Sequence, residues 1–309
     1  MDKKIRSIKI NKRLINTNTS PNVVAEILSK SHEDISSNEY SEKYKFNKYD
    51  YWKRKLFNLN NEKIEPLIFS KKKKNINVSK SLFSNNIDVV NIETSSYCNR
   101  KCSYCPVSIY GRGEKIFMSN KLLNSILDGL KDIKYKKLIS LNLYNEPLSS
   151  IEFYKVLKLI KKKLPNAITG TNSNGDYIKN RDDLIRLADS GLNRIKITAH
   201  TPPKKSYSKK YMTIRIMDFA KRIDYKLTKE NLKNLNFQFK INNLVGIYQC
   251  PDWFSSGNSR GGIIKELNKK SLRQKPCVKP FREFTIYYDG TVTPCCDIYH
   301  GENYSKHII

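Results

Sequence analysis

The sequence has little acidic charge and no long apolar segment. Its 309 residues include 58 lysines and arginines but only 29 aspartates and glutamates, which gives a formal net charge of +29. No run of residues is long and apolar enough to span a bilayer, which takes about 20 apolar residues in a helix. Residues 1–20 carry charges throughout and lack the apolar centre of a secretory signal peptide. We therefore expect neither membrane insertion nor export, and we place the chain in the cytoplasm.

Disulfides and zinc fingers are not favoured either. The seven cysteines are Cys98, Cys102, Cys105, Cys250, Cys277, Cys295 and Cys296. Their clustering suits thiolate ligands of a metal in a reducing compartment more than the disulfides of a secreted protein. No second C-x2-C or H-x3-H pair lies near enough to the first three to complete a compact zinc finger.

The positive charge is a weak guide to partners. Such an excess usually indicates nucleic acid or an anionic surface. Here the lysines are spread along the whole chain with asparagine and isoleucine, and the densest run, at 71–74, has the character of a solvated linker. We therefore expect no nucleic-acid partner, although a basic surface can steer a phosphorylated, nucleotide-linked or acidic peptide substrate.

Three cysteines, Cys98, Cys102 and Cys105, form a C-x3-C-x2-C motif, and Tyr104 directly precedes the third. Three thiolates at this spacing can hold three irons of a [4Fe-4S] cluster and leave the fourth iron without a protein ligand. A small molecule can then bind that iron, as at a catalytic metal site rather than a closed structural one. Zinc held by the same cysteines and a distant histidine is the other interpretation of the motif.

The motif closely resembles the C-x3-C-x-aromatic-C signature of the radical SAM superfamily. The resemblance implies that S-adenosylmethionine (SAM) chelates the open iron and that its reductive cleavage yields a 5′-deoxyadenosyl radical. In such enzymes the cofactor carries the chemistry, while the protein binds it, orients it and excludes water. The resemblance also implies that Tyr104 contacts the cofactor and that a reductant such as flavodoxin or ferredoxin supplies an electron.

Around the motif, strand-like and helix-like segments alternate. The strand-like segments are 88–94, 137–143, 167–171, 194–198, 236–241 and 244–249, and the helix-like ones are 119–131, 151–163, 182–190 and 211–227. Such alternation implies a parallel sheet with right-handed crossovers. Together with the resemblance, it predicts an α/β fold, a partial (β/α)6 TIM-like barrel of parallel strands, with a small C-terminal β-hairpin extension.

Candidate cofactor-binding residues follow the predicted strands, because binding and catalytic residues of parallel sheets lie at the C-terminal ends of the strands. By resemblance, Glu146 and Pro147 stand in the Gly-Gly-Glu-Pro motif that holds the SAM amino group, although Tyr144 and Asn145 replace its glycines. The alternative is that Glu146 only caps the next turn.

Two weaker matches lie further along the chain. Asn172 and Ser173 resemble a loop that contacts SAM, and Thr198 stands where the superfamily often has a serine near the ribose or carboxylate. Ordinary turn chemistry explains residues of these types after strands equally well.

The remaining cysteines flank a predicted β-hairpin whose turn is Asp289-Gly290. Cys277, Cys295 and Cys296 surround it in a C-x12-G-x4-C-C pattern that resembles the first half of a SPASM or twitch extension. The resemblance implies that these three cysteines ligate a second, auxiliary [4Fe-4S] cluster.

The resemblance to that extension is incomplete, because the chain ends at Ile309, before the later cysteines of a full SPASM domain. We therefore expect an abbreviated twitch-type extension or a truncated chain. Three roles are open to Cys250: a further cluster ligand, a hydrogen-atom donor to a substrate radical, or an ordinary buried thiol.

We thus expect three regions: a basic N-terminal extension at 1–86, a radical SAM core at 87–249 and a partial SPASM or twitch extension at 250–309. The resemblance predicts an oxidoreductase or isomerase that abstracts a hydrogen atom from a peptide, sugar or nucleotide-linked substrate. Oxidation, cross-linking or epimerisation would follow. The opposing hypothesis is a zinc-stabilised basic nucleic-acid-binding protein.

Overall fold

The computed structural model describes residues 7–10, 13–16, 75–111, 113–257, 259–260, 262–267, 279–293 and 295–299. The chain forms two compact units, residues 1–87 with 271–282 and residues 88–270 with 283–309. The expected N-terminal extension thus ends close to a unit boundary. The residues from 283 onward belong to the same unit as the core.

Within the described residues, eight strands of the second unit form one open sheet in the order β10-β9-β3-β4-β5-β6-β8-β7. The strands are β3 (Val89–Ile92), β4 (Leu138–Ser140), β5 (Ile168–Ser173), β6 (Arg194–Thr198), β7 (Asn236–Ile241), β8 (Leu244–Gln249), β9 (Glu283–Ile286) and β10 (Val292–Thr293). Neighbours from β9 to β8 pair in parallel, and the two edge pairs are antiparallel. This is the predicted partial barrel of parallel strands.

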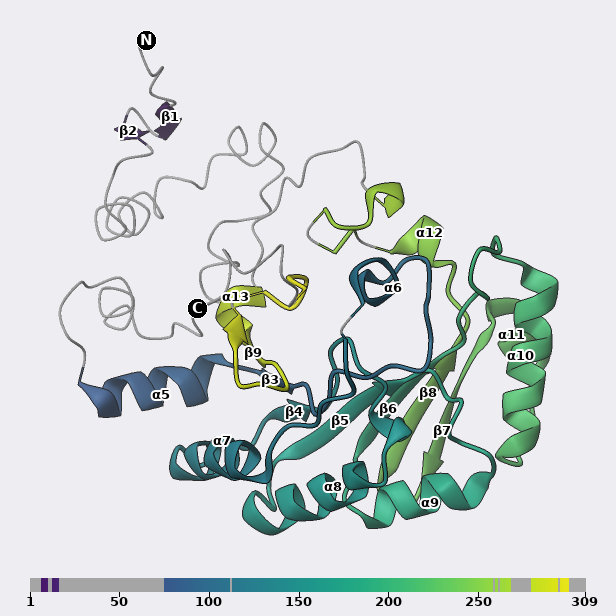
Figure 1. Ribbon diagram of the computed structural model, residues 1–309, viewed down its shortest axis with the longest axis horizontal. Coiled ribbons are helices and arrows are strands. Elements are labelled where there is room, and N and C mark those ends of the chain that lie inside the picture. Colours follow the sequence, from purple (N-terminus) through teal and green to yellow (C-terminus); the bar gives the residue numbers. More distant parts are fainter. Residues whose placement is uncertain are drawn as a thin grey trace. The chain divides into compact units, whose positions relative to one another are not determined.

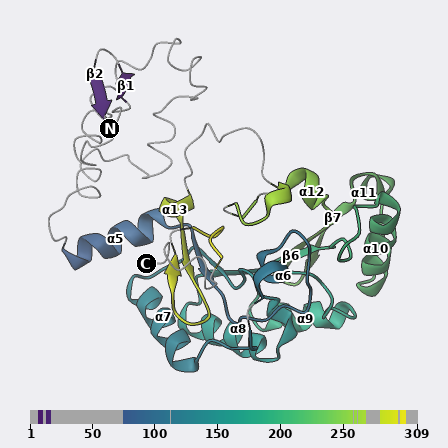
Figure 2. The same ribbon diagram turned by 45° about the horizontal axis from the view of Figure 1, so that its top comes forward.

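Helices cover the outer face of this sheet (Figure 1). They are α7 (Asn120–Asp132), α8 (Glu152–Lys163), α9 (Arg181–Asp189) and α10 (Lys209–Arg222). The short helices α6 (Pro106–Tyr110) and α12 (Trp253–Ser256) lie on the other side of the sheet in both ribbon views (Figure 2). The long helices thus pack against one face of the sheet, and the other face is available for a functional site.

Local sequence accounts for where these helices begin and what they bury. Ser119 caps α7 by accepting a hydrogen bond from the backbone N–H of Leu122 at 3.2 Å, as its side chain predicts. In α8, Phe153, Leu157 and Ile160 are buried, which confirms the predicted apolar face. Spacing of three and four residues places these side chains on one side of the helix, toward the sheet.

The C-terminal hairpin forms as predicted, but it is part of the main sheet. Gly290 has a φ of +93°, and the backbone N–H of Thr291 donates to the Asp289 carboxylate at 3.0 Å. Glycine suits this turn because a side chain would strain a positive φ. Strand β9 also pairs in parallel with β3, Asn91 opposite Thr285, so the hairpin extends the barrel wall.

Two expectations need correction beyond residue 210. The predicted 211–227 helix ends at Arg222, and a short separate helix, α11 (Lys229–Asn234), follows it with Thr228 in a capping box. Strand β7 is antiparallel to β8, not part of the parallel run. Only two residues link Ile241 to its partner Leu244, and a parallel pair needs a far longer crossover.

The first unit contributes a few described elements. Strands β1 (Ser7–Ile10) and β2 (Arg13–Asn16) form an antiparallel pair. Helix α5 (Ile76–Asn86) is capped by Asn75, whose side chain accepts a hydrogen bond from Asn77, and α13 (Lys279–Arg282) is a single turn. The aromatic-rich stretch at 40–59 lies outside the described residues.

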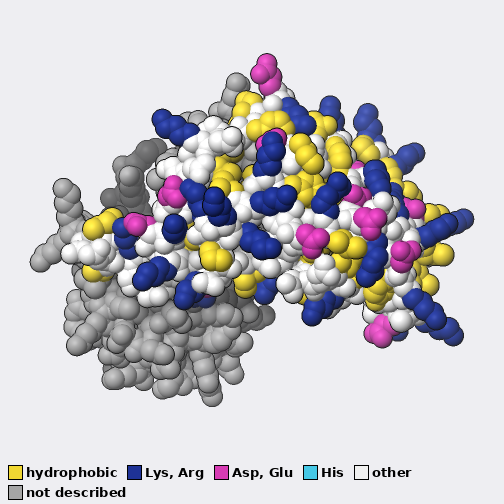
Figure 3. Space-filling view, turned by 90° about the horizontal axis from the view of Figure 1, so that it is seen from below, with side chains coloured by type: hydrophobic (Ala, Val, Ile, Leu, Met, Phe, Trp, Pro, Cys, Tyr) yellow, Lys and Arg dark blue, Asp and Glu magenta, His cyan; other side chains and the backbone are white. Residues whose placement is uncertain are grey.

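The surface agrees with the composition. On the face seen in Figure 3, lysine and arginine side chains are scattered among acidic and apolar ones and form no single patch. No helix in the described part of the chain is both long and apolar enough to cross a membrane.

We expect Leu157→Ala to lower the free energy of unfolding by about 2–5 kcal/mol, because Leu157 is fully buried between α8 and the sheet. Chemical denaturation followed by circular dichroism measures the change. Lys158→Ala, at an exposed position of the same helix, is the control and should change stability by less than about 0.5 kcal/mol. Equal effects of both variants would contradict this packing.

Candidate active site

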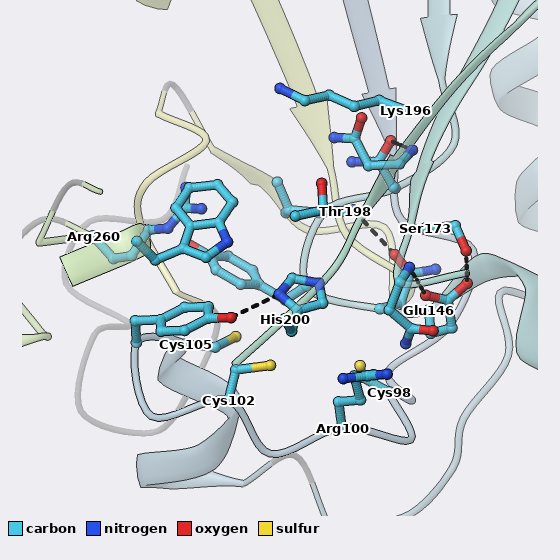
Figure 4. A pocket seen from close by; sticks show the side chains of 18 of the residues that line it. Cys98, Arg100, Cys102, Cys105, Glu146, Ser173, Lys196, Thr198, His200 and Arg260 are labelled. Atoms are coloured by element: carbon cyan, nitrogen blue, oxygen red, sulfur yellow. Dashed lines mark hydrogen bonds between the residues drawn. The ribbon is translucent and has the colours of Figure 1, made fainter. Parts of the chain in front are cut away.

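A pocket lies at the C-terminal ends of the parallel strands, and each segment around it contributes side chains (Figure 4). The cysteine loop contributes Cys98, Arg100, Cys102, Tyr104 and Cys105, and the segment after β4 contributes residues 142–146. The end of β5 contributes residues 172–174, and β6 with the residues just after it contributes Lys196, Thr198 and His200. The later chain contributes Trp253, Arg260 and Leu267. Loops at one edge of a sheet converge in this way because parallel strands all end there.

The cysteine loop is closed at its base and packed at its far end. Next to β3, the N–H of Met118 donates to the Thr94 carbonyl at 3.0 Å. Across the loop, the Ser96 hydroxyl donates to the Glu114 carbonyl and accepts a hydrogen bond from the Ile116 N–H. Beyond the motif, α6 starts directly after Cys105. The Cys105 N–H donates to the Cys102 carbonyl at 2.9 Å, which folds the second and third cysteines into one turn.

The three cysteines are reduced thiols that open onto this one pocket. Burial raises the pKa of Cys98 to about 12 and that of Cys102 to about 11. A thiolate buried among apolar atoms needs a positive partner, and metal binding is the usual one because a ligating cysteine is deprotonated. The described residues contain no group of three acidic, histidine or cysteine side chains that converges on a single metal ion.

Glu146 is almost completely buried, with 2% of its surface exposed, yet three donors hold its carboxylate. Oε1 accepts hydrogen bonds from the Ser173 hydroxyl at 2.8 Å and the Leu148 N–H at 3.2 Å, and Oε2 accepts one from the Asn174 N–H at 2.7 Å. Burial raises the pKa of Glu146 to about 7, while these bonds act against the rise. Capping of the next turn through Leu148 is therefore real, but it uses only one of the three bonds.

Hydrogen bonds from residues 145 and 146 connect the segment around Glu146 to the cysteine loop. The Glu146 N–H donates to the Tyr97 carbonyl at 2.8 Å, and the Asn145 amide donates to Thr94 at 3.2 Å. Pro147 begins the following 3-10 turn, Pro147–Ser149, and is buried. The residues that replace the two glycines thus have structural partners, since the Tyr144 N–H also donates to the buried Glu93 carboxylate at 2.9 Å.

An ion pair that the sequence did not reveal joins the cysteine loop to the loop after β5. Arg100 donates to Asp176 through Nε at 2.7 Å and through a terminal nitrogen at 2.5 Å, and Asn99 adds a bond at 2.9 Å. Burial acts to raise the pKa of Asp176, but these partners lower it overall. This paired geometry makes the contact specific as well as favourable.

The loop after β5 also depends on Gly175, which has a φ of +75°. A side chain there would meet a methyl group of Ile197 at 2.7 Å. Glycine lets the chain turn sharply beneath β6, so that Ser173 and Asn174 face Glu146 while Asp176 faces Arg100.

Tyr104 joins the cysteine loop to β6. Its hydroxyl lies 2.8 Å from Nδ1 of His200, and its ring stacks on Trp253 with centroids 5.7 Å apart. Burial lowers the pKa of His200 to about 4, and the positive charge of Arg100 acts in the same direction, so the imidazole is neutral at pH 7. These contacts fix the aromatic ring that precedes the third cysteine.

The C-terminal segment closes one side of the pocket. Arg260 pairs with Asp297 at 2.9 Å, and the Tyr299 hydroxyl donates to the Gly111 carbonyl at 2.6 Å. Tyr144 and Tyr299 meet edge to face with centroids 5.0 Å apart, in a buried cluster with Cys102 and Tyr104. The residues after β8 and β9 therefore shield the cysteine loop from water.

Most of the predicted cofactor residues meet in this pocket. Asn172 and Ser173 line it from β5 and Thr198 lines it from β6, beside Tyr104 and Glu146. Lys196 was not predicted as a site residue, although it lies two residues before Thr198 and therefore on the same face of β6. Trp253 was not predicted either, because nothing local in the sequence indicates that α12 lies over the sheet.

The other cysteines lie elsewhere. The Cys250 thiol is buried after β8 and faces the carbonyl of Met212 in α10, with a sulfur–oxygen distance of 3.7 Å, and it does not line the pocket. This is the placement of a packed core thiol. Cys295 and Cys296 are half-buried after β10, and Cys277 lies outside the described residues.

These residues fit a [4Fe-4S] cluster with SAM. Three thiols of the required spacing face one pocket, and a buried carboxylate beside them is held by donors that leave it able to accept more hydrogen bonds. A carboxylate has about four acceptor positions, and three are used here. The Glu146 carboxylate can therefore accept a further hydrogen bond from an ammonium group bound in the pocket.

Comparisons with known proteins give a family match, a curated relative and a solved structure of similar fold. The model of the Radical SAM superfamily matches residues 92–249. A curated relative from Niallia circulans, the S-adenosyl-L-methionine-dependent 2-deoxy-scyllo-inosamine dehydrogenase, is 23% identical over 207 residues, 67% of this chain and 72% of the relative. The crystal structure of BtrN in complex with AdoMet and 2-DOIA has a TM-score of 0.51 at 22% identity and covers 68% of this chain and 74% of that one.

We expect Asp176→Asn to lower the free energy of unfolding by about 1–3 kcal/mol at pH 7, because it weakens two charge-assisted bonds to Arg100. The lowered pKa of Asp176 means that its contribution is present above the ordinary value of about 3.9 and is lost as the pH falls through the folded value. Denaturation at pH 7 and pH 3 tests this. The difference in unfolding free energy between wild type and variant should be smaller at pH 3 than at pH 7, and exposed Asp182→Asn is the control.

Proposed function

This chain belongs to the radical SAM superfamily and is a radical SAM enzyme, and from that premise we propose that the pocket residues bind its cofactors and that it oxidises a hydroxyl-bearing, sugar-type substrate. The family match favours this function over a zinc-stabilised nucleic-acid-binding protein. The observation that carries the assignment of the site is the meeting of three thiols and one buried carboxylate in a single pocket.

Cys98, Cys102 and Cys105 would hold the [4Fe-4S] cluster from the loop after β3. When bound, the cluster and SAM supply a 5′-deoxyadenosyl radical that takes a hydrogen atom from the substrate. The chain contributes a loop closed by backbone bonds at its base and clamped by the Arg100–Asp176 pair at its side. Fixing the three thiols in this way reduces the ordering needed when the metal binds.

Glu146 would bind the methionyl ammonium of SAM. Its bonds to Ser173 and Asn174 fix the carboxylate and favour the ionised form, which an ammonium needs. Tyr104, Asn172 and Thr198 line the same pocket and would contact the rest of the cofactor. Pro147 does not line the pocket in the described structure, and we assign it the role of starting the turn that positions Glu146.

Oxidation of a substrate alcohol is the favoured outcome. The relative from Niallia circulans is named as a dehydrogenase of an inosamine, and the similarity covers two thirds of this chain. Converting a secondary alcohol to a ketone removes one hydrogen atom, one proton and one electron. The radical that SAM supplies would take the hydrogen atom, and the hydroxyl proton would pass to solvent. An auxiliary iron–sulfur cluster, for which Cys277, Cys295 and Cys296 would be the ligands, would accept the electron.

Other outcomes follow less well from the site. Epimerisation through Cys250 would need its thiol in the pocket, but the thiol faces Met212 instead. Peptide cross-linking is the second candidate outcome. The required external electron donor would be a small protein such as flavodoxin or ferredoxin.

We expect Ala in place of Cys98, Cys102 or Cys105 to abolish formation of 5′-deoxyadenosine by anaerobically reconstituted protein with dithionite, because a cluster that loses one of three protein ligands has no stable site. Chromatography of the products and an iron assay measure this. Cys250→Ala is the control and should keep both iron and SAM cleavage. In a triple variant with Ala at all three of these cysteines, the iron that remains measures the proposed auxiliary cluster.

SAM cleavage by the triple variant at the wild-type rate would refute the assignment of the cluster. The absence of any SAM cleavage by the iron-loaded wild-type protein would refute the proposed function as a whole.

We expect SAM affinity to rise between pH 6 and pH 8, because ionised Glu146, with a pKa of about 7, binds the ammonium and the protonated acid does not. Glu146→Gln should weaken binding about 10-fold at pH 8 and flatten the pH dependence. Calorimetric titration with SAM measures both. Exposed Glu152→Gln is the control, and an unchanged dissociation constant in Glu146→Gln would leave Glu146 with only its capping role.

A further inference from the structure

Three polar side chains cross the inner face of the sheet beyond Glu146, and we call Asn142, Asn172 and Lys196 the polar row. Asn172 and Lys196 are direct partners across β5 and β6, and all three residues line the pocket. The Asn142 Oδ1 atom accepts hydrogen bonds from the Asn172 N–H at 2.8 Å and the Ser140 hydroxyl at 3.1 Å. Its amide nitrogen is therefore left to donate to a ligand in the pocket that Lys196 also lines.

Lys196 differs from the other two cations of the pocket. Arg100 is paired with Asp176, and Arg260 is paired with Asp297. Within the described residues, the Lys196 ammonium has no ion-pair or hydrogen-bond partner, although it lines the same pocket. A lysine ammonium offers three donors and a full charge, so a ligand with a negative group gains most from this position.

The carboxylate of SAM is a poor candidate for that negative group. It is attached to the same carbon as the ammonium that Glu146 would bind, so it must lie at the Glu146 end of the pocket. Figure 4 shows the Lys196 side chain extended away from Glu146 along the opposite edge. The amino acid group of SAM would therefore bind at the Glu146 end of the pocket, and Lys196 lies at a different part of it.

The wall formed by the later chain has a different character. Trp253 and Leu267 line it, and Trp253 is held in place by stacking on Tyr104. A ligand between this wall and the polar row meets an aromatic and aliphatic surface on one side and donors on the other. Rings that carry hydroxyl groups on their edges and C–H groups on their faces match such a pair of walls.

We propose that the substrate is a polyol that carries an anionic group, phosphate or carboxylate, and that the polar row binds this group with Lys196 supplying the charge. This inference rests on the proposed function, because it assigns the substrate of the same site. It also implies that an amine at that position of the ring is repelled by Lys196.

Calorimetry on the reconstituted, SAM-bound enzyme without reductant tests the proposal. The probes are scyllo-inositol, its monophosphate and its monoamine, with glucose and glucuronate as the carboxylate pair. We expect at least one acidic probe to bind about 10-fold or more tightly than its neutral partner, and the amine to bind more weakly than scyllo-inositol. Whether the phosphate or the carboxylate gains more identifies the acidic group.

Variants show whether Lys196 is responsible. Lys196→Met should reduce the affinity for the acidic probe to that of the neutral one, and Lys196→Arg should keep most of the preference because it keeps the charge. Lys162→Met removes an exposed lysine of α8 outside the pocket, and it should change neither. The preference should also shrink with added salt, as expected of a charge interaction near solvent.

Three results would overturn the proposal: equal binding of acidic and neutral probes, tighter binding of the amine, or failure of every acidic probe to bind. A Lys196→Met variant that loses SAM affinity but keeps the acid preference would assign the lysine to the cofactor instead. These results are distinct from failure of the proposed function, because an enzyme that cleaves SAM without preferring acids refutes only the substrate class.

Discussion

Glu146 organises the site, because this one buried residue connects three of the segments that line the pocket: its own, the cysteine loop and the end of β5. Its backbone N–H binds the Tyr97 carbonyl just before the first cysteine, and its side chain accepts hydrogen bonds from Ser173 and Asn174 after β5. A carboxylate in this position would be costly without partners, since removing a charge from water disfavours its ionised form. The donors around it lower that cost and at the same time fix the loops that carry them.

The Arg100–Asp176 pair complements this arrangement from the other side of the cysteine loop. Asp176 follows Asn174 by two residues, so the same loop after β5 holds Glu146 through one residue and Arg100 through another. Gly175, between them, allows the sharp turn that aims the two contacts in different directions. The loop after β5 thus has a structural role toward the cysteine loop in addition to lining the pocket.

The residues from 283 onward belong to the same compact unit as the core, and the described ones among them pack beside the pocket. Strand β9 pairs with β3, and Tyr299 and Arg260 pack toward the cysteine loop. Radical chemistry requires that water and other reactants be kept from the site. In this protein the segments after β8 and β9 provide part of that exclusion, and they also provide the apolar wall opposite the polar row.

Local sequence was sufficient to predict the alternation of strands and helices, the apolar face of α8, the Ser119 cap and the C-x3-C-x2-C motif, because these depend on residues close together in the chain. Resemblance to the Gly-Gly-Glu-Pro motif, together with its position after a predicted strand, also indicated Glu146. The folded chain was needed to show that Asp176 pairs with Arg100, that Lys196 and Asn142 line one pocket, and that Trp253 stacks on Tyr104. These contacts join residues far apart in the sequence, and strand order and loop geometry, which no local pattern encodes, bring them together. The same reason explains why Cys250, at the end of a strand like the other candidates, faces α10 and not the pocket.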